Sequence, residues 1–183
     1  MTHRLRLARD WLRSGAVLAY PTEAVYGLGC DPGNERAITR LLRLKQRTPD
    51  KGLILIAADM TQLRPFVQEL EPARMAIIQA SWPGPNTWLL PVRDHVSPLL
   101  SGRFDTLAVR VTAHPLAAAL CRTFGGALVS TSANRAAQPP ARQAWQLRQR
   151  LGCLPDAVLT GACGDRSRPS CIRDGRSGRV LRG

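Results

Sequence analysis

The chain has 183 residues, a hydrophobic content of 44% and a formal net charge of +13. This length allows a core that buries roughly 70% of the surface of the unfolded chain. No apolar stretch approaches the ~20 residues of a membrane-spanning helix, and no apolar segment of signal-peptide length follows the basic N-terminus. We therefore predict a single domain over residues 1–183 that lies in the cytoplasm and is not bound to a membrane.

Helices and strands alternate along most of the chain, and residues 21–34 form an irregular, glycine-rich segment between two of them. In chain order we expect helices at 4–14, 35–45, 59–70, 72–81, 114–125 and 141–151. We expect strands at 16–20, 53–58, 107–112, 127–132, 156–161, 170–174 and 179–183, and a turn that leads into a strand at 82–92. Asn34 and Asp59 are suited to cap the helices that follow them. This alternation predicts an α/β fold with a twisted, mixed sheet.

Arginine supplies almost all of the basic charge, and the two lysines lie six residues apart in KQRTPDKGLILI (45–56). Widespread arginine is consistent with codon bias, whereas two lysines in one loop indicate that the local chemistry requires them. The segment is either a solvated basic turn or an anion site in which Lys45, Arg47 and Lys51 converge. The strand after it is an unbroken apolar run, which predicts burial on both faces.

Three other segments place polar groups at strand ends, where ligands bind in open α/β sheets. They are YPTEAVYGLG (20–29), LAVRVT (107–112) and ALVSTSANR (127–135). Arg110 interrupts an apolar strand, so it either meets a carboxylate or phosphate or faces solvent. There is no GxxxxGK[ST] or GxGxxG motif, so any nucleotide site is built differently. The five cysteines are scattered, which predicts free thiols.

Five motifs together resemble the YrdC/TsaC family of threonylcarbamoyl-AMP synthases. They occur in the family's order and are YPTEAVYGLG, KQR followed by KGLI, LAVRVTAHP, LVSTSAN and PSCIRD. The resemblance runs from about residue 16 to residue 182 and is closest to the short, single-domain bacterial form. It implies a YrdC-like fold with a concave basic cavity.

The resemblance also implies a reaction, in which L-threonine, bicarbonate and ATP give threonylcarbamoyl-AMP and pyrophosphate. Mg²⁺ would arrive with ATP, with no metal held by the protein. A separate transferase complex would then move the threonylcarbamoyl group to adenosine 37 of tRNA. The alternative is an RNA-binding module that uses the same basic surface for tRNA or double-stranded RNA, which the net charge favours.

Functional residues are carried over from the resemblance position by position. Those implied to be catalytic are Lys45, Arg47 and Lys51. Those implied to bind ATP are Arg47, Lys51, Thr106, Asn134, Arg142 and Arg182. Those implied to bind threonine are Thr22, Ala24, Arg110, Ser132 and Ser170.

The sequence departs from the family at two positions in these motifs. Thr48 stands where members usually have proline, and Pro49 follows one place later. Because proline fixes its own φ and restricts the residue before it, the path of the basic loop is expected to differ. Cys171 follows Ser170 where a polar residue is more usual.

Overall fold

A computed structural model of the chain describes residues 2–167 and 170–182. Pro169 in the PSCIRD segment and Gly183 at the end of the last expected strand lie outside the described residues. The helices are α1 His3–Arg13, α2 Glu35–Lys45, α3 Pro72–Ala80, α4 Pro98–Ser101, α5 Pro115–Phe124 and α6 Leu147–Leu151, with 3₁₀ turns η1 Pro49–Lys51, η2 Met60–Gln62 and η3 Ala144–Gln146.

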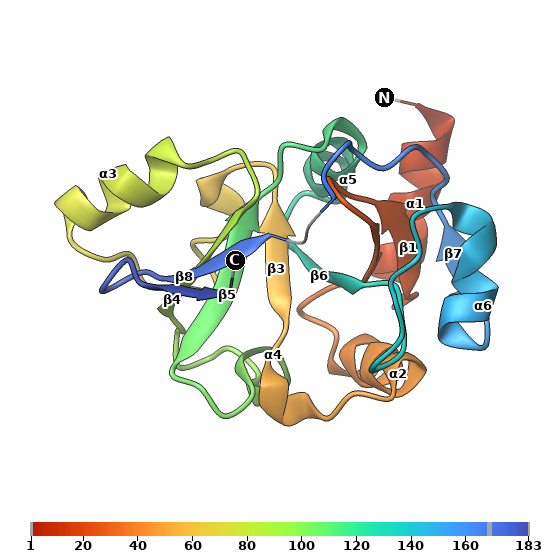
Figure 1. Ribbon diagram of the computed structural model, residues 1–183, viewed down its shortest axis with the longest axis horizontal. Coiled ribbons are helices and arrows are strands. Elements are labelled where there is room, and N and C mark those ends of the chain that lie inside the picture. The colour runs from red at the N-terminus through yellow and green to blue at the C-terminus, as the bar shows by residue number, and fades with distance from the viewer. Residues whose placement is uncertain (1, 168–169, 183) are drawn as a thin grey trace.

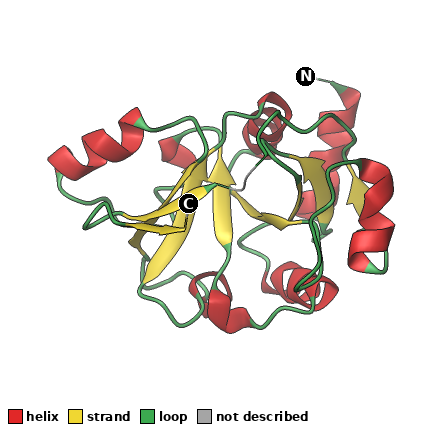
Figure 2. Cartoon of the chain, in the orientation of Figure 1, coloured by secondary structure: helices red, strands yellow, loops and turns green. Residues whose placement is uncertain are grey.

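The strands form one mixed sheet in the order β7-β1-β2-β6-β3-β5-β4-β8-β9. Their bounds are β1 Leu18–Pro21, β2 Tyr26–Gly29, β3 Ile54–Ala57, β4 Asn86–Pro91, β5 Thr106–Val111, β6 Leu128–Ser132, β7 Ala157–Val158, β8 Cys171–Asp174 and β9 Val180–Arg182. Pairs β1–β7, β3–β5 and β4–β8 are parallel. The remaining pairs are antiparallel. The predicted mixed α/β fold is confirmed (Figures 1 and 2).

Strand β6 changes its partner along its length. Leu128 to Ser130 pair with β3, and Thr131 and Ser132 pair with β2. This change of partner brings the polar end of β6 between the two halves of the sheet, and Figure 1 shows β6 running between β3 and β1.

Two hydrophobic clusters cover opposite faces of the sheet because successive strand residues point to opposite sides. One contains α1 and α5 residues together with Ile56 and Leu128, and α1 packs beside α5 in Figure 1. The other contains residues of α2, α3 and α6 together with Leu55 and Val129. The expected burial of β3 on both faces is therefore confirmed.

Three expected elements are wrong. The 21–34 segment is not irregular throughout, because it contains β2. The two glycines of β2 weaken the signal from which a strand is predicted. The helix expected at 59–70 is only η2 followed by turns, because Pro65 cannot continue a helix. The helix expected at 141–151 is split into η3 and α6.

The two cap predictions are confirmed in their local contacts. The Asn34 side chain accepts a hydrogen bond from the Ala37 backbone N–H at the start of α2. Asp59 accepts one from Gln62, at the start of the short η2. Among the residues described, none of the helices combines the length and hydropathy that crossing a bilayer requires.

Candidate active site

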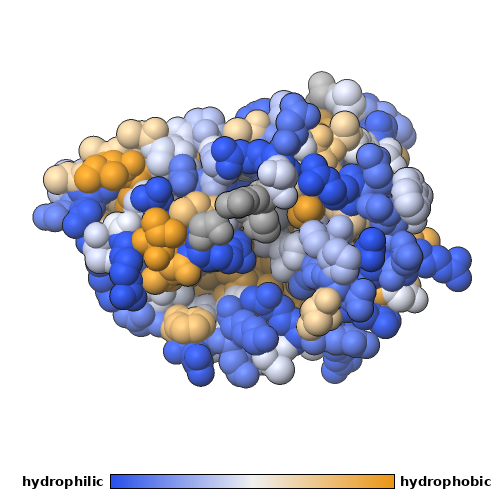
Figure 3. All heavy atoms as spheres, viewed as in Figure 1, coloured by the Kyte–Doolittle hydropathy of each residue, from blue (hydrophilic) through white to orange (hydrophobic). Residues whose placement is uncertain are grey.

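A cavity of about 530 Å³ lies beside the sheet where β6 changes partner. Its wall includes Gly27 from β2, Ile54 from β3 and residues 130–132 at the end of β6. This volume is within the range of small-molecule sites in proteins. Hydrophilic side chains surround a hollow near the middle of the face in Figure 3, with apolar patches over α3 and beside the C-terminal end.

Cationic side chains dominate the charged groups of the cavity wall. They are Arg47, Lys51, Arg110, Arg166 and Arg182. Among the described lining residues, Glu23 is the single carboxylate that opposes them. Such an excess of positive charge attracts anions.

Arg47 and Arg182 are held in place by main-chain oxygens. Arg47 Nη2 donates to the carbonyl of Gly52 at 2.8 Å, and Arg182 Nη2 donates to that of Ser170 at 3.2 Å. Burial and then the charge of Arg182 lower the pKa of Arg47. Burial and then the charge of Arg110 lower the pKa of Arg182. These cations therefore disfavour one another's charge, and a bound anion would relieve that repulsion.

The basic loop has a defined path between α2 and β3. Helix α2 ends at Lys45, and the next residue, Gln46, adopts a left-handed conformation with φ 52°. Thr48 is extended, and Pro49 is the first residue of η1, a position that proline favours. Gly52 has φ 60°, and a Cβ there would lie 2.9 Å from the Ser101 carbonyl oxygen. With the proline in this place, both Arg47 and Lys51 line the cavity.

Lys45 is buried beneath this wall, and the structure does not place it in the cavity lining. Its Nζ donates to the carbonyl oxygens of Ser132 and Asn134, the latter at 2.8 Å. Burial, and then the charge of Arg47, lower the pKa of Lys45 to about 8. Asn134 is likewise outside the lining, and its Oδ1 accepts from Ser132 Oγ at 2.6 Å. Both residues therefore shape the turn that carries Ser132.

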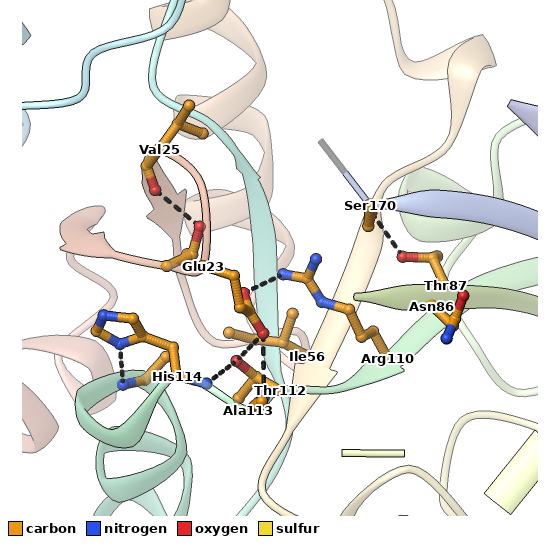
Figure 4. A network of polar contacts seen from close by, with 12 residues as sticks. Glu23, Val25, Ile56, Asn86, Thr87, Arg110, Thr112, Ala113, His114 and Ser170 are labelled. Atoms are coloured by element: carbon orange, nitrogen blue, oxygen red, sulfur yellow. Dashed lines mark hydrogen bonds and ion pairs between the residues drawn. The ribbon is translucent and has the colours of Figure 1, made fainter. Parts of the chain in front are cut away.

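Arg110 is buried in β5 and faces a carboxylate rather than solvent. Its Nη2 lies 3.2 Å from Glu23 Oε2, and the two side chains reach toward each other in Figure 4. Burial raises the pKa of Glu23, but the charge of Arg110 and hydrogen bonds from Thr112 and Ala113 outweigh it and hold that pKa below its ordinary value.

Most of the other residues predicted to bind threonine or ATP line the cavity, and one does not. Those in the lining are Thr22, Ala24, Thr106, Ser132 and Ser170. Thr22 Oγ1 donates to the Val25 carbonyl at 2.7 Å. Thr87 Oγ1 donates to Ser170 Oγ at 2.9 Å, as Figure 4 shows. Arg142 is not among the lining residues, and its Nη2 donates to the Arg166 carbonyl at 3.3 Å.

Two charged cavity residues were not assigned a role from the sequence. Glu23 lies in the PTEA segment, but its pairing with a strand 87 residues away leaves no local signal. Arg166 lies in a tail rich in glycine, serine and arginine, where nothing distinguishes it from its neighbours. All five cysteines are free thiols, as expected.

The chain is similar to known proteins both in sequence and in structure. A curated protein of Nitrosococcus oceani named threonylcarbamoyl-AMP synthase is 58% identical over 98% of this chain and 97% of its own length. One of Alkalilimnicola ehrlichii with the same name is 55% identical over 98% of this chain and 95% of its own. A crystal structure of P. abyssi Sua5 complexed with L-threonine superposes with a TM-score of 0.86 at 30% identity.

The Sua5 superposition covers 93% of this chain, which spans about half of the Sua5 chain (50%). A family model named Sua5/YciO/YrdC, described as "Telomere recombination", matches residues 10–183. The cavity-lining motifs all lie within those residues. The chain belongs to the Sua5/YciO/YrdC family.

Proposed function

We propose that this protein is a threonylcarbamoyl-AMP synthase, an enzyme that joins L-threonine, bicarbonate and ATP into threonylcarbamoyl-AMP and pyrophosphate. The observation that carries the proposal is a small-molecule cavity lined by five cations, in a chain 58% identical to a relative with that name. The name favours this activity over an RNA-binding module that uses the same surface. The product would pass to a transferase complex that modifies tRNA.

Threonine binds in the part of the cavity around Arg110. Arg110 Nε is buried, and no described residue accepts a hydrogen bond from it. A substrate carboxylate would accept from this group, and a guanidinium suits a carboxylate because it offers parallel N–H donors. Thr22, Ala24, Ser132 and Ser170 lie in the same wall, where they contact the rest of the amino acid.

ATP binds along the side that carries Arg47, Lys51, Arg182 and Thr106. Lys51 supplies a flexible point charge for phosphate oxygens, while Arg47 and Arg182 are fixed by their main-chain contacts. Asn134 and Arg142 remain predicted ATP contacts at the rim. Lys45 remains a predicted catalytic residue, and its contacts support an effect transmitted through Ser132 and Asn134.

The chain's residues would promote two successive bond-forming steps by positioning and by charge neutralisation. The threonine amine attacks the carbon of bicarbonate, and water leaves to give a carbamate. A carbamate oxygen then attacks the α-phosphate of ATP, and pyrophosphate leaves. The cations Arg47, Lys51 and Arg182 would neutralise charge on the departing pyrophosphate, and the cavity wall would keep bulk water from the carbamate.

Mg²⁺ would enter with ATP as part of the substrate and neutralise phosphate charge. Within residues 2–167 and 170–182 no group of three His, Cys, Asp or Glu side chains converges as a metal site. The cavity carboxylate, Glu23, is already engaged by Arg110. The phosphates, rather than carboxylates of this chain, are therefore the proposed ligands of the ion.

Pyrophosphate release tests the proposal directly. The protein is incubated with ATP and Mg²⁺, with threonine, bicarbonate or both present. We expect release only when both are supplied, together with a product of the mass of threonylcarbamoyl-AMP. Release that ignores the omission of either compound would contradict the proposal.

A further inference from the structure

We propose that Glu23 is a positioning residue that orients the Arg110 guanidinium for the carboxylate of threonine. This inference rests on the proposed function. Glu23 has no role assigned by the motifs that identify the family, and its position follows from the contacts between β5 and the segment after β1.

The Glu23 carboxylate is fixed from the side away from Arg110. Its Oε1 accepts from Thr112 Oγ1 at 2.7 Å and from the Ala113 backbone N–H at 3.0 Å. Thr112 Oγ1 in turn accepts from the backbone N–H of His114 at 3.2 Å. Figure 4 shows these groups on one side of the carboxylate and Arg110 on the other. The second carboxylate oxygen is thereby aimed at the guanidinium.

The Arg110 guanidinium uses only part of its donor capacity in this contact. Nη2 lies 3.2 Å from Glu23 Oε2, while Nε has no acceptor among the described residues. Arg110 is 8% exposed and lines the cavity, and its Nε is the guanidinium nitrogen that is buried without an acceptor among the described residues. Buried donors without acceptors are costly. A ligand carboxylate that enters the cavity would remove that cost, provided that the guanidinium keeps its orientation.

Glu23 is better suited to this positioning role than to taking a proton from the threonine amine. Its Oε1 already accepts two hydrogen bonds, and its Oε2, which accepts none from the described residues, lies in the ion pair with Arg110. Its pKa lies below the ordinary value of a glutamate because the Arg110 charge and the hydrogen bonds outweigh burial. A carboxylate with such a pKa is a weak general base at neutral pH. The ion pair therefore serves to hold the arginine.

Substitution by the isosteric amide separates these roles. In Glu23→Gln the side chain keeps its size and one acceptor oxygen, but it loses the charge that faces Arg110. We expect KM for threonine to rise about tenfold or more, with kcat and KM for ATP changed less than about threefold. Glu69→Gln is the matched control, because Glu69 forms an exposed pair with Arg64 and does not line the cavity.

A double-mutant cycle with Arg110→Lys adds a second readout. Lysine keeps the positive charge but has no planar fork to orient. In the Arg110→Lys background, Glu23→Gln should therefore change KM for threonine by less than about twofold. A further change of about tenfold in that background would overturn the proposal, because the two residues would then act independently.

Other outcomes also decide the question. A fall in kcat with unchanged KM for threonine would overturn the proposal in favour of proton transfer by Glu23. Equal losses for threonine and ATP would mean a merely structural role. If Glu23→Gln does not fold, Thr112→Val decides, since it removes one hydrogen bond from the carboxylate and should raise KM for threonine alone.

These results are distinguishable from failure of the proposed function. If the wild-type chain releases no pyrophosphate that depends on threonine, the synthase proposal itself is wrong. If the wild type does so and Glu23→Gln matches it in KM for threonine, only the positioning role of Glu23 is wrong.

Discussion

At the residue scale, the two lysines of the chain have different environments although they lie six residues apart. Lys45, at the end of α2, is buried and holds main-chain oxygens of residues 132 and 134. Lys51, at the end of η1, is exposed and lines the cavity. The turn at Gln46 separates the two lysines, so they contact different groups although they belong to one sequence motif.

We expect Lys51→Ala to lower turnover about tenfold or more, because a phosphate loses a point charge. The stability of the protein should stay within about 0.5 kcal/mol of the wild type, since exposed side chains away from structural contacts contribute little. Steady-state pyrophosphate release and urea unfolding measure the two quantities. A rate equal to that of the wild type would show that Lys51 is misassigned.

Lys45→Met tests whether a residue outside the cavity lining controls the site. The apolar stem is preserved, but the Ser132 and Asn134 carbonyls lose a charged donor. We expect the Ser132 turn to loosen and turnover to fall about tenfold or more, measured by pyrophosphate release. Wild-type turnover in a folded Lys45→Met protein would mean that the turn keeps its shape without the ammonium group.

The Glu23 ion pair predicts a dependence of stability on pH. Its pKa in the folded protein lies below the ordinary value of 4.5, so between the two values the unfolded chain binds more protons. The ionised group therefore stabilises the fold above about pH 4.5, and this stabilisation is lost as pH falls through the folded pKa. The stability difference between wild type and Glu23→Gln should be present at about pH 7 and shrink at about pH 3.5, measured by urea unfolding.

Glu69→Gln again serves as the control, because the exposed Arg64–Glu69 pair should contribute little at any pH. A stability difference for Glu23→Gln that does not change with pH would show that the ion pair is not its cause.

At the element scale, the sequence predicts the parts whose signals are local. Helix α2 is capped by Asn34 and carries a regular apolar face, so its bounds are confirmed. Strand β2 could not be found from the sequence because Gly27 and Gly29 remove its side-chain pattern. Glycine is required at position 29 by a close contact with another strand, which the local sequence does not reveal. A Cβ there would lie 2.3 Å from the Val129 carbonyl oxygen of the β2–β6 region.

The candidate site likewise contains residues with a local sequence signal and residues without one. Arg110 stands out in the sequence because it interrupts an apolar strand, and it lines the cavity, where it meets a carboxylate. The partner that fixes it, Glu23, and the burial of Lys45 depend on strand order, which no local pattern encodes. Several residues that line the cavity could therefore be named from the sequence, whereas the contacts that hold them in place could not.

The contact between α4 and η1 gives a prediction at this scale. Gly102 has φ 66°, and a Cβ there would lie 2.5 Å from the Asp50 carbonyl oxygen. Gly125 has φ 91°, but a Cβ there would meet nothing within 4 Å. We expect Gly125→Ala to cost about 1 kcal/mol of stability for its backbone conformation alone, and Gly102→Ala to cost about 1–2 kcal/mol more.

Gly102→Ala should also raise KM for ATP, because η1 precedes Gly52, whose carbonyl holds Arg47. Gly125→Ala should leave KM for ATP unchanged. Urea unfolding and steady-state kinetics of both variants measure these effects. Equal losses of stability with unchanged kinetics in both variants would mean that the α4–η1 contact does not position the basic loop.

At the scale of the whole molecule, the net charge of +13 and the cavity are separate features. Five of the 26 basic residues line the cavity, and many others lie exposed along α1, α2 and α6. Aromatic residues make up 5% of the chain, so stacking platforms for single-stranded RNA are scarce. Charge of this kind attracts polyanions without recognising a sequence.

We therefore expect duplex RNA to bind weakly and to be released by salt. If binding neutralises six or more phosphates, the affinity should fall by about 10³ or more between about 50 mM and about 200 mM KCl, because the released counterions oppose binding. Lys51→Ala should change this affinity little, since one charge among 26 basic residues is removed. Threonine-dependent pyrophosphate release should fall far less over the same range, because Arg110 is buried and Arg47 is half-buried, so salt screens their charges less. Tight RNA binding that persists at about 200 mM KCl and is lost in Lys51→Ala would instead place a built RNA site at the cavity.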